Sequence, residues 1–296
     1  MSAHPTARIL ARVALLVLAL TACAPKGLEA ARSALRTNDL PTARALLEAD
    51  RERFPNSVPV RLALGEVYYR SARDALDWDN DEGRYLSFLE KSVDEFVRAA
   101  ALDPKNPQPL FFLAMIDMYR GDLDAAQRGL RNTKRLGFGP IGDTNIAEGY
   151  IYAGNLMEAS RWNEAGRLGG AGLGPVTFNE MLMQWSKGDL GAARESFELL
   201  RVQYPEMIRT INVAPLPTAP RKFEEFAGYC CASPACGPYL EQACAALSLP
   251  VKHREISKET LLQELRLEME SKRKLQEIYR QRKEIEIEVK PEEPAH

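Results

Sequence analysis

The sequence predicts an all-α protein in which helix–turn–helix units stack into a solenoid, followed by a cysteine-containing segment and a long charged helix. The main observation is a six-residue turn that holds a polar residue second, Leu third and Ala last. It occurs at residues 38–43, 121–126, 154–159 and 188–193. The last three copies begin 33 and 34 residues apart, and apolar residues on both sides recur at helical spacing. Each unit is therefore expected to bury one face of two helices.

Length and composition fit a folded protein of one large domain or two smaller ones. The chain has 296 residues, of which 45% are hydrophobic and 27% are charged. Its formal net charge is −2, which gives no strong attraction for nucleic acid, and none is expected as a partner.

The first residues predict a secretory signal. Arg8 and Arg12 precede the apolar residues 13–20, a run shorter than the roughly 20 residues of a membrane span. Residues 20–23, Leu-Thr-Ala-Cys, resemble the lipobox of bacterial lipoproteins. The resemblance implies a signal peptide at residues 1–22 and cleavage before Cys23, whose acyl chains would anchor the protein through a tether at residues 23–27. Ala at position 24 favours anchoring in the outer membrane, with the protein facing the periplasm. The alternative to a lipoprotein signal is an ordinary secretory signal.

Residues 28–210 resemble about five tetratricopeptide repeats (TPRs). The clearest first-helix match is residues 64–68, Leu-Gly-Glu-Val-Tyr, in which the small Gly65 lets a neighbouring helix approach. The second repeat is longer than the family spacing, which predicts an insertion around residues 74–83.

The TPR resemblance implies a partner-binding groove on the concave face, lined by the first helix of each repeat. Its expected residues lie three, six or ten positions before each turn, or at equivalent positions of the first two repeats. They are Leu28, Leu35, Leu62, Tyr69, Phe111, Met115, Met118, Phe178, Leu182 and Trp185. The alternative is that these residues are core, or are covered by the chain's own Pro-rich connector, because periodicity alone does not separate a groove from a core.

No catalytic set, metal site or cofactor site is predicted, and the protein is expected not to be an enzyme. Asp77, Asp79 and Asp81 have the start of a calcium loop, but Glu82 stands where Gly is needed and Phe88 where Glu is needed. Residues 169–174 have glycines at phosphate-loop spacing, but a dinucleotide site also needs a preceding strand, and none is predicted.

The segment at residues 211–256 combines a Pro-rich connector with four cysteines: Cys230, Cys231, Cys236 and Cys244. An even number in an exported chain predicts two disulfides. Adjacent cysteines rarely bond to each other, so Cys230 and Cys231 are each expected to pair with Cys236 or Cys244. A zinc site and a redox role are the alternatives.

A charged helix is predicted at residues 257–283, capped by Ser257, and an acidic, disordered tail at residues 284–296. The mixed charges of the helix indicate a solvated surface helix. A weak coiled-coil seam is the alternative, formed by Leu261, Leu265, Leu275 and Tyr279 but interrupted by Glu268 and Lys272.

Taken together, these features predict a lipid-anchored TPR scaffold that assembles or operates an envelope complex. Its partners would be envelope proteins bound in the concave groove, with the final helix as a second candidate contact. In plan the chain resembles secretin pilotins of type IV pili and TPR lipoproteins of gliding-motility machinery. The alternatives are a factor for outer-membrane protein or polysaccharide assembly, and a cell-wall enzyme or its activator.

Overall fold

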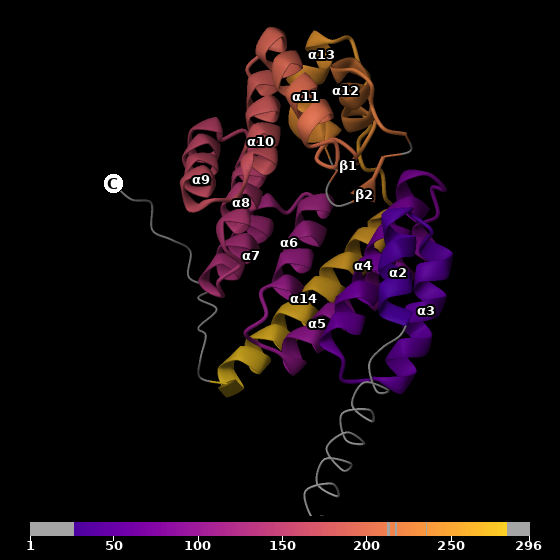
Figure 1. Cartoon of the computed structure of the whole chain (residues 1–296). Helices are drawn as coiled ribbons and strands as arrows, with labels where there is room; N and C mark the ends of the chain where they lie inside the picture. Colours follow the sequence, from indigo (N-terminus) through magenta and orange to yellow (C-terminus); the bar gives the residue numbers. More distant parts are fainter. Residues whose placement is uncertain (1–26, 212–213, 217, 235, 283–296) are drawn as a thin grey trace, which may run out of the picture.

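A computed structural model describes residues 27–211, 214–216, 218–234 and 236–282, which are mainly helical (Figure 1). The first ten helices among the described residues form five consecutive antiparallel hairpins. They are α2 (Gly27–Arg36) with α3 (Leu40–Arg53), α4 (Val58–Asp77) with α5 (Glu82–Leu102), α6 (Gln108–Arg120) with α7 (Leu123–Arg135), α8 (Pro140–Tyr152) with α9 (Leu156–Gly169), and α10 (Leu173–Ser186) with α11 (Leu190–Gln203). The all-α, solenoid-like expectation is therefore confirmed.

The recurring six-residue sequence forms the turn inside four of these hairpins. Its first residue takes a left-handed conformation, with φ from +58° to +91°, which Asn and Gly adopt at low cost. The second residue caps the next helix, because its side-chain oxygen accepts a hydrogen bond from a backbone N–H three residues later. The last residue, Ala in every copy, is fully buried between the two helices. The turns are at Asn38, Gly121, Gly154 and Gly188.

The second hairpin has no such turn, because its helices continue through the expected insertion. α4 has 20 residues and α5 has 21, whereas the helices of the other hairpins have 10 to 14. Asp81 caps α5 by accepting from the N–H of Arg84. Asp77, the first of the three aspartates that have the start of a calcium loop, is buried at the end of α4. The extra length gives α5 a surface on which another helix can lie.

After α11 the chain forms a small disulfide-containing unit beside the last hairpins. Strands β1 (Thr210–Ile211) and β2 (Ala214–Pro215) pair antiparallel. Helix α12 (Phe223–Cys231), the 3₁₀ helix η1 (Gly237–Leu240) and helix α13 (Glu241–Ala246) follow, and we call these three elements the C-terminal module. The module contacts α8, α10 and α11 (Figure 1).

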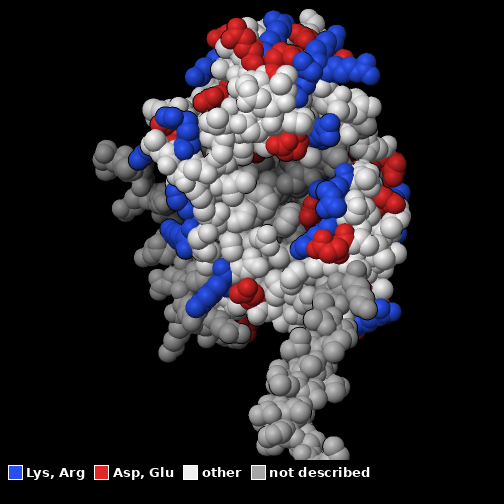
Figure 2. Space-filling view, viewed as in Figure 1, with Lys and Arg blue, Asp and Glu red and all other residues white. Residues whose placement is uncertain are grey.

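The final helix, α14 (Lys258–Arg282), returns across the molecule and packs along α5 (Figure 1). Ser257 caps it as predicted, since its hydroxyl accepts from the N–H of Thr260 at 3.2 Å. On the face shown in Figure 2, basic and acidic side chains are intermixed around the edges and the middle is largely uncharged.

The substitution Gly65→Ala tests whether α4 and α5 pack as closely as the structure shows. A Cβ atom at this position would lie 2.6 Å from the ring of Phe96, which is fully buried. We expect Gly65→Ala to lower the free energy of unfolding by about 1–3 kcal/mol, because the ring has to move in a packed core. Urea unfolding followed by circular dichroism measures this.

Gly228→Ala in α12 is the control, because no heavy atom lies within 4 Å of the added Cβ. It should leave stability unchanged or raise it by up to about 1 kcal/mol through helix propensity. Equal effects of the two substitutions would contradict the packing argument.

Candidate functional site

The residues predicted to line a concave groove are not open to solvent in this structure. All ten except Phe111 are buried, and Tyr69, Met118, Leu182 and Trp185 are completely so. Phe111 is half-buried and packs on Phe112 and Phe138, with ring centroids 5.4 and 5.1 Å away. Leu28 and Leu35 belong to the core of the first hairpins, and most of the others to the main core.

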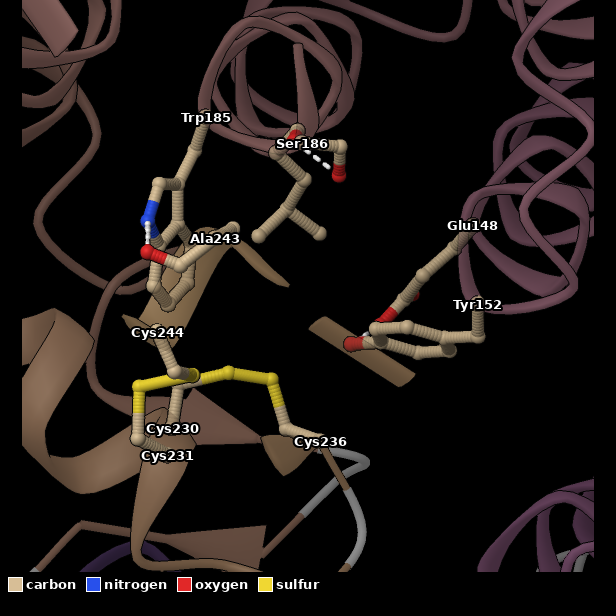
Figure 3. The surroundings of a disulfide bond; sticks show 10 residues. Glu148, Tyr152, Trp185, Ser186, Cys230, Cys231, Cys236, Ala243 and Cys244 are labelled. Carbon is tan, nitrogen blue, oxygen red and sulfur yellow. Dashed lines mark hydrogen bonds between the residues drawn. A yellow bond between two sulfur atoms is a disulfide. The ribbon is translucent and has the colours of Figure 1, made fainter. Parts of the chain in front are cut away.

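The C-terminal module covers Trp185 (Figure 3). The indole Nε1–H donates to the backbone carbonyl of Ala243 in α13 at 3.1 Å. The ring of Phe223 in α12 meets the indole edge to face, with centroids 5.5 Å apart. A buried tryptophan normally has a partner for its N–H, and here the partner lies 58 residues away in the sequence. Trp185 therefore joins the last hairpin to the module.

A second contact joins the module to the third hairpin. The hydroxyl of Tyr239 in η1 donates to the backbone carbonyl of Met118 at 2.9 Å, and its ring lies 5.5 Å from that of Tyr152. Tyr152 donates in turn to Glu148 on α8 at 2.9 Å. Burial raises the pKa of Glu148 above its ordinary value. The carbonyl that Tyr239 uses belongs to a predicted groove residue.

Two disulfides hold the module together (Figure 3). Cys230 pairs with Cys236, and Cys231 pairs with Cys244, with Cα–Cα distances of 5.2 and 5.9 Å. This pairing agrees with the expectation that the adjacent cysteines bond elsewhere. Cys244 directly follows Ala243, whose carbonyl accepts the hydrogen bond from Trp185. The Cys231–Cys244 disulfide therefore fixes the part of α13 that covers the indole.

The burial of these residues agrees with the alternative that they are core, and the C-terminal module covers Trp185 and Phe178 among them. The covering elements are α12, η1 and α13, which follow the Pro-rich connector. That these ten residues bind a partner stays a prediction. Cys23 lies outside the described residues, as do the signal peptide and the acidic tail. Within the described part, no helix is long and apolar enough to cross a membrane.

A cluster of buried charges fixes α14 to the hairpins. The carboxylate of Glu264, which is 1% exposed, accepts from the hydroxyl of Tyr85 and from Arg254. Its other oxygen lies 3.5 Å from Nε of Arg120, whose Nη2 is 2.8 Å from Glu268. Burial raises the pKa of Tyr85 well above its ordinary value, which keeps the phenol protonated as a donor.

The buried face of α14 differs from the seam proposed for a coiled coil. Leu275 and Tyr279 face the protein, but Leu261 and Leu265 are exposed. Thr260 and Glu264 occupy the buried positions in the first half of the helix, because the hairpins offer Tyr85, Arg120 and Glu82 as polar partners there.

A cavity of about 170 Å³ lies between α14 and the α5–α6–α7 side of the hairpins. Its walls are mainly apolar, formed by Leu89, Val93, Leu110, Leu113, Leu267 and Leu275. Arg128, Asn132, Lys272 and Gln276 add polar groups. On α6 the cavity residues lie on a different face from Phe111, Met115 and Met118. The cavity is therefore separate from the predicted groove.

Asp117 lies in the wall of this cavity with its carboxylate 3.7 Å from Arg120. Burial raises its pKa to about 7; Lys272 and Arg120 oppose the rise, and Glu268 and Asp122 add to it. A carboxyl group here is therefore partly protonated near neutral pH.

Arg120, Arg254 and Glu264 were not predicted as interacting residues, since nothing local shows that Arg120 and Glu264, 144 positions apart, meet. The cavity was not predicted either, although a weak signal for it exists. Ala114 and Gly129 are small because α6 and α7 touch there, and a Cβ on Gly129 would lie 2.9 Å from that of Ala114. Small residues on facing helices predict such close contact but do not show what lies beside it.

The rejected motifs show no site in the described part of the chain. Among these residues, no group of three or more His, Cys, Asp or Glu side chains is arranged to hold a metal ion. Residues 169–174 close α9 and open α10, with Gly170 and Gly172 in left-handed conformations, and a helix rather than a strand precedes them. They are turn glycines in this fold.

Neither models of protein families nor curated proteins gave a match to this chain.

Trp185→Ala tests whether this residue belongs to the core. Because the indole is fully buried and hydrogen-bonded, we expect a loss of about 3–5 kcal/mol in the free energy of unfolding. Trp78→Ala is the matched control, since Trp78 is 62% exposed, and it should change stability by no more than about 0.5 kcal/mol. A loss below about 1 kcal/mol for Trp185→Ala would contradict the core assignment.

Asp117→Asn tests the raised pKa through the pH dependence of stability. The folded state keeps this proton up to about pH 7, whereas the unfolded state releases it near the ordinary value of 3.8. The wild-type protein therefore loses this contribution to stability as the pH rises from about 4 to 7. The Asn side chain does not ionise. The free energy of unfolding of the variant should therefore rise relative to that of wild type by on the order of 1–3 kcal/mol by pH 8.

Urea unfolding of both proteins at pH 4.5, 6 and 8 measures the difference. Asp124→Asn, which removes a carboxylate from an exposed position of α7, should show a much smaller change over the same range. A difference between wild type and Asp117→Asn that does not vary with pH would show that Asp117 ionises normally.

Proposed function

We propose that this protein is a non-enzymatic TPR scaffold, anchored by acyl chains on Cys23 to the periplasmic side of the outer membrane, which holds or assembles an envelope complex. The observation that supports the scaffold most directly is the run of five consecutive hairpins from α2 to α11. Stacked hairpins present an extended surface made of many short segments, and repeat proteins use such surfaces to bind other proteins.

The disulfides add support for an exported protein. Cys230, Cys231, Cys236 and Cys244 are all buried and paired, and such pairs persist in oxidising compartments rather than in the cytosol. The Leu-Thr-Ala-Cys sequence at residues 20–23 supplies the acylation site. Pilotin-like assembly and gliding motility are the scaffold roles closest in plan, and this analogy concerns architecture alone.

Two other roles agree with some of these features. A factor for outer-membrane protein or polysaccharide assembly would use the same hairpin surfaces. An activator of a cell-wall enzyme would need only a binding surface, whereas a cell-wall enzyme would need reactive groups. Hydrolysis of peptidoglycan by the purified protein would favour the enzyme and count against the scaffold.

Cys23→Ser tests the anchor. The full-length chain should label with an alkyne palmitate analogue and fractionate with the outer membrane, and the variant should lose the label and appear in the soluble periplasm. Multiple acyl chains give stable anchoring, so their loss should release nearly all of the protein. Thr21→Ser, which changes a neighbouring residue of the same signal, should behave as wild type. Membrane retention of unlabelled Cys23→Ser protein would show that another feature anchors the chain.

The scaffold itself is tested by crosslinking in the producing cells, followed by purification from solubilised envelopes. We expect one dominant multiprotein complex that contains this chain. Recovery of the chain alone, with photo-crosslinkers placed on each of the five hairpins, would contradict the scaffold proposal.

A further inference from the structure

The cavity beside α14 offers space for a ligand of apolar character. Three hairpin helices and α14 surround it, and their side chains are mainly aliphatic. Its volume, about 170 Å³, is close to the roughly 150 Å³ of an engineered apolar cavity that binds benzene. One leucine or phenylalanine side chain matches this size, whereas a folded segment does not.

The cavity is held open by fixed contacts on both sides. Across the hairpin, Gly129 and Ala114 bring α7 and α6 together, so neither helix carries a long side chain at that point. On the other side, Arg120 ties α14 in place through Glu264 and Glu268. Because α14 packs on α5, the space beside α6 and α7 remains unfilled. A ligand would therefore enter a preformed site.

Arg128 gives the cavity an exposed cation. Its side chain reaches the solvent and has no ion pair with the described part of the chain. On α7, Arg128 is followed by Arg131 and Arg135 at helical spacing, so one edge of this helix is basic. Across the cavity Lys272 bonds to Glu268, and Gln276 is exposed. A ligand with a carboxylate beside its apolar group would meet Arg128.

Asp117 does not prevent the approach of an acidic ligand. Its pKa is raised to about 7 by burial, so much of its charge is absent near neutral pH. The other acid in the lining, Glu268, is already bonded to Arg120 and Lys272. The available charge at this site is therefore positive.

We propose that this cavity is a docking site for an acidic segment of a partner protein, which inserts a leucine or phenylalanine side chain between α14 and α6–α7 and places a neighbouring carboxylate on Arg128. This inference rests on the proposed scaffold function and names a site and partner chemistry for it. The site lies away from the face that the C-terminal module covers.

The test begins with a photo-crosslinking amino acid in place of Gln276, at the exposed edge of the cavity, in the full-length protein in its cells. The crosslinked segment is identified by mass spectrometry. We expect one segment of another protein that contains Leu or Phe within three residues of Asp or Glu. A segment without that pattern, or crosslinking only to residues 283–296 of the same chain, would overturn the proposal. Those residues are a necessary comparison, because they alternate Glu with Ile and Val.

A labelled synthetic peptide of the crosslinked segment then gives the dissociation constant with purified full-length protein. Arg128→Glu should weaken binding at least tenfold and reduce its dependence on salt, because a charge pair is lost. Gln276→Trp, which places a bulky side chain at the edge without altering a buried contact, should also weaken binding at least tenfold. Arg161→Glu on α9, whose side chain is 81% exposed, should leave binding unchanged. Equal binding by all variants would overturn the site.

The two proposals fail in different ways. Crosslinks from the five hairpins to an envelope protein, with none from position 276, would remove this site and leave the scaffold. No crosslink from any position would remove both.

Discussion

The buried carboxylate of Glu264 joins three parts of the chain that are far apart in sequence. It belongs to α14, accepts from Tyr85 of α5 and from Arg254 in the segment between α13 and α14, and lies close to Arg120 at the end of α6. Taking these charges out of water is costly, and only several simultaneous partners offset the cost. The position of α14 therefore depends on this cluster.

The same cluster extends toward the core. Arg254 also lies over the rings of Tyr85 and Tyr119, and the hydroxyl of Tyr119 donates to Asp77 at 2.6 Å. Asp77 ends α4, and Lys252 in the segment between α13 and α14 donates to its backbone carbonyl. The length of the second hairpin thus has a structural role, because it brings Asp77 and Tyr85 to the path of the returning chain.

Local features of this fold follow from the sequence, whereas contacts between distant segments do not. The turn at Gly121 and the cap at Asp122 depend on neighbouring backbone groups alone, so a six-residue pattern identifies both. Trp185 shows the limit: its periodicity identifies a helix with an apolar face but does not reveal that Ala243 covers that face. Glu264 shows this limit of sequence-based prediction more strongly, because a glutamate in a charged helix indicates a solvated position until its partners are known.

The pairing of the cysteines is predictable in part, between the local features and the distant contacts. Adjacency of Cys230 and Cys231 argues against a bond between them, but their choice between Cys236 and Cys244 depends on how α12 and α13 pack. The cavity had only an indirect signal, since Ala114 and Gly129 report a helix contact and not the space next to it.

Covering one face of a helical solenoid with its own C-terminal segment changes where a partner can bind. The main-chain carbonyls of Met118 in α6 and of Ala243 in the module both accept hydrogen bonds across the contact, so hydrogen bonds as well as apolar packing hold the module in place. Two disulfides join elements of the module to each other, so it covers the hairpins as one unit. A partner of this protein therefore gains most from surfaces that need no rearrangement, since opening the covered face would first require breaking buried hydrogen bonds. The preformed cavity between α14 and α6–α7 meets that condition, because α14 is already fixed by Glu264.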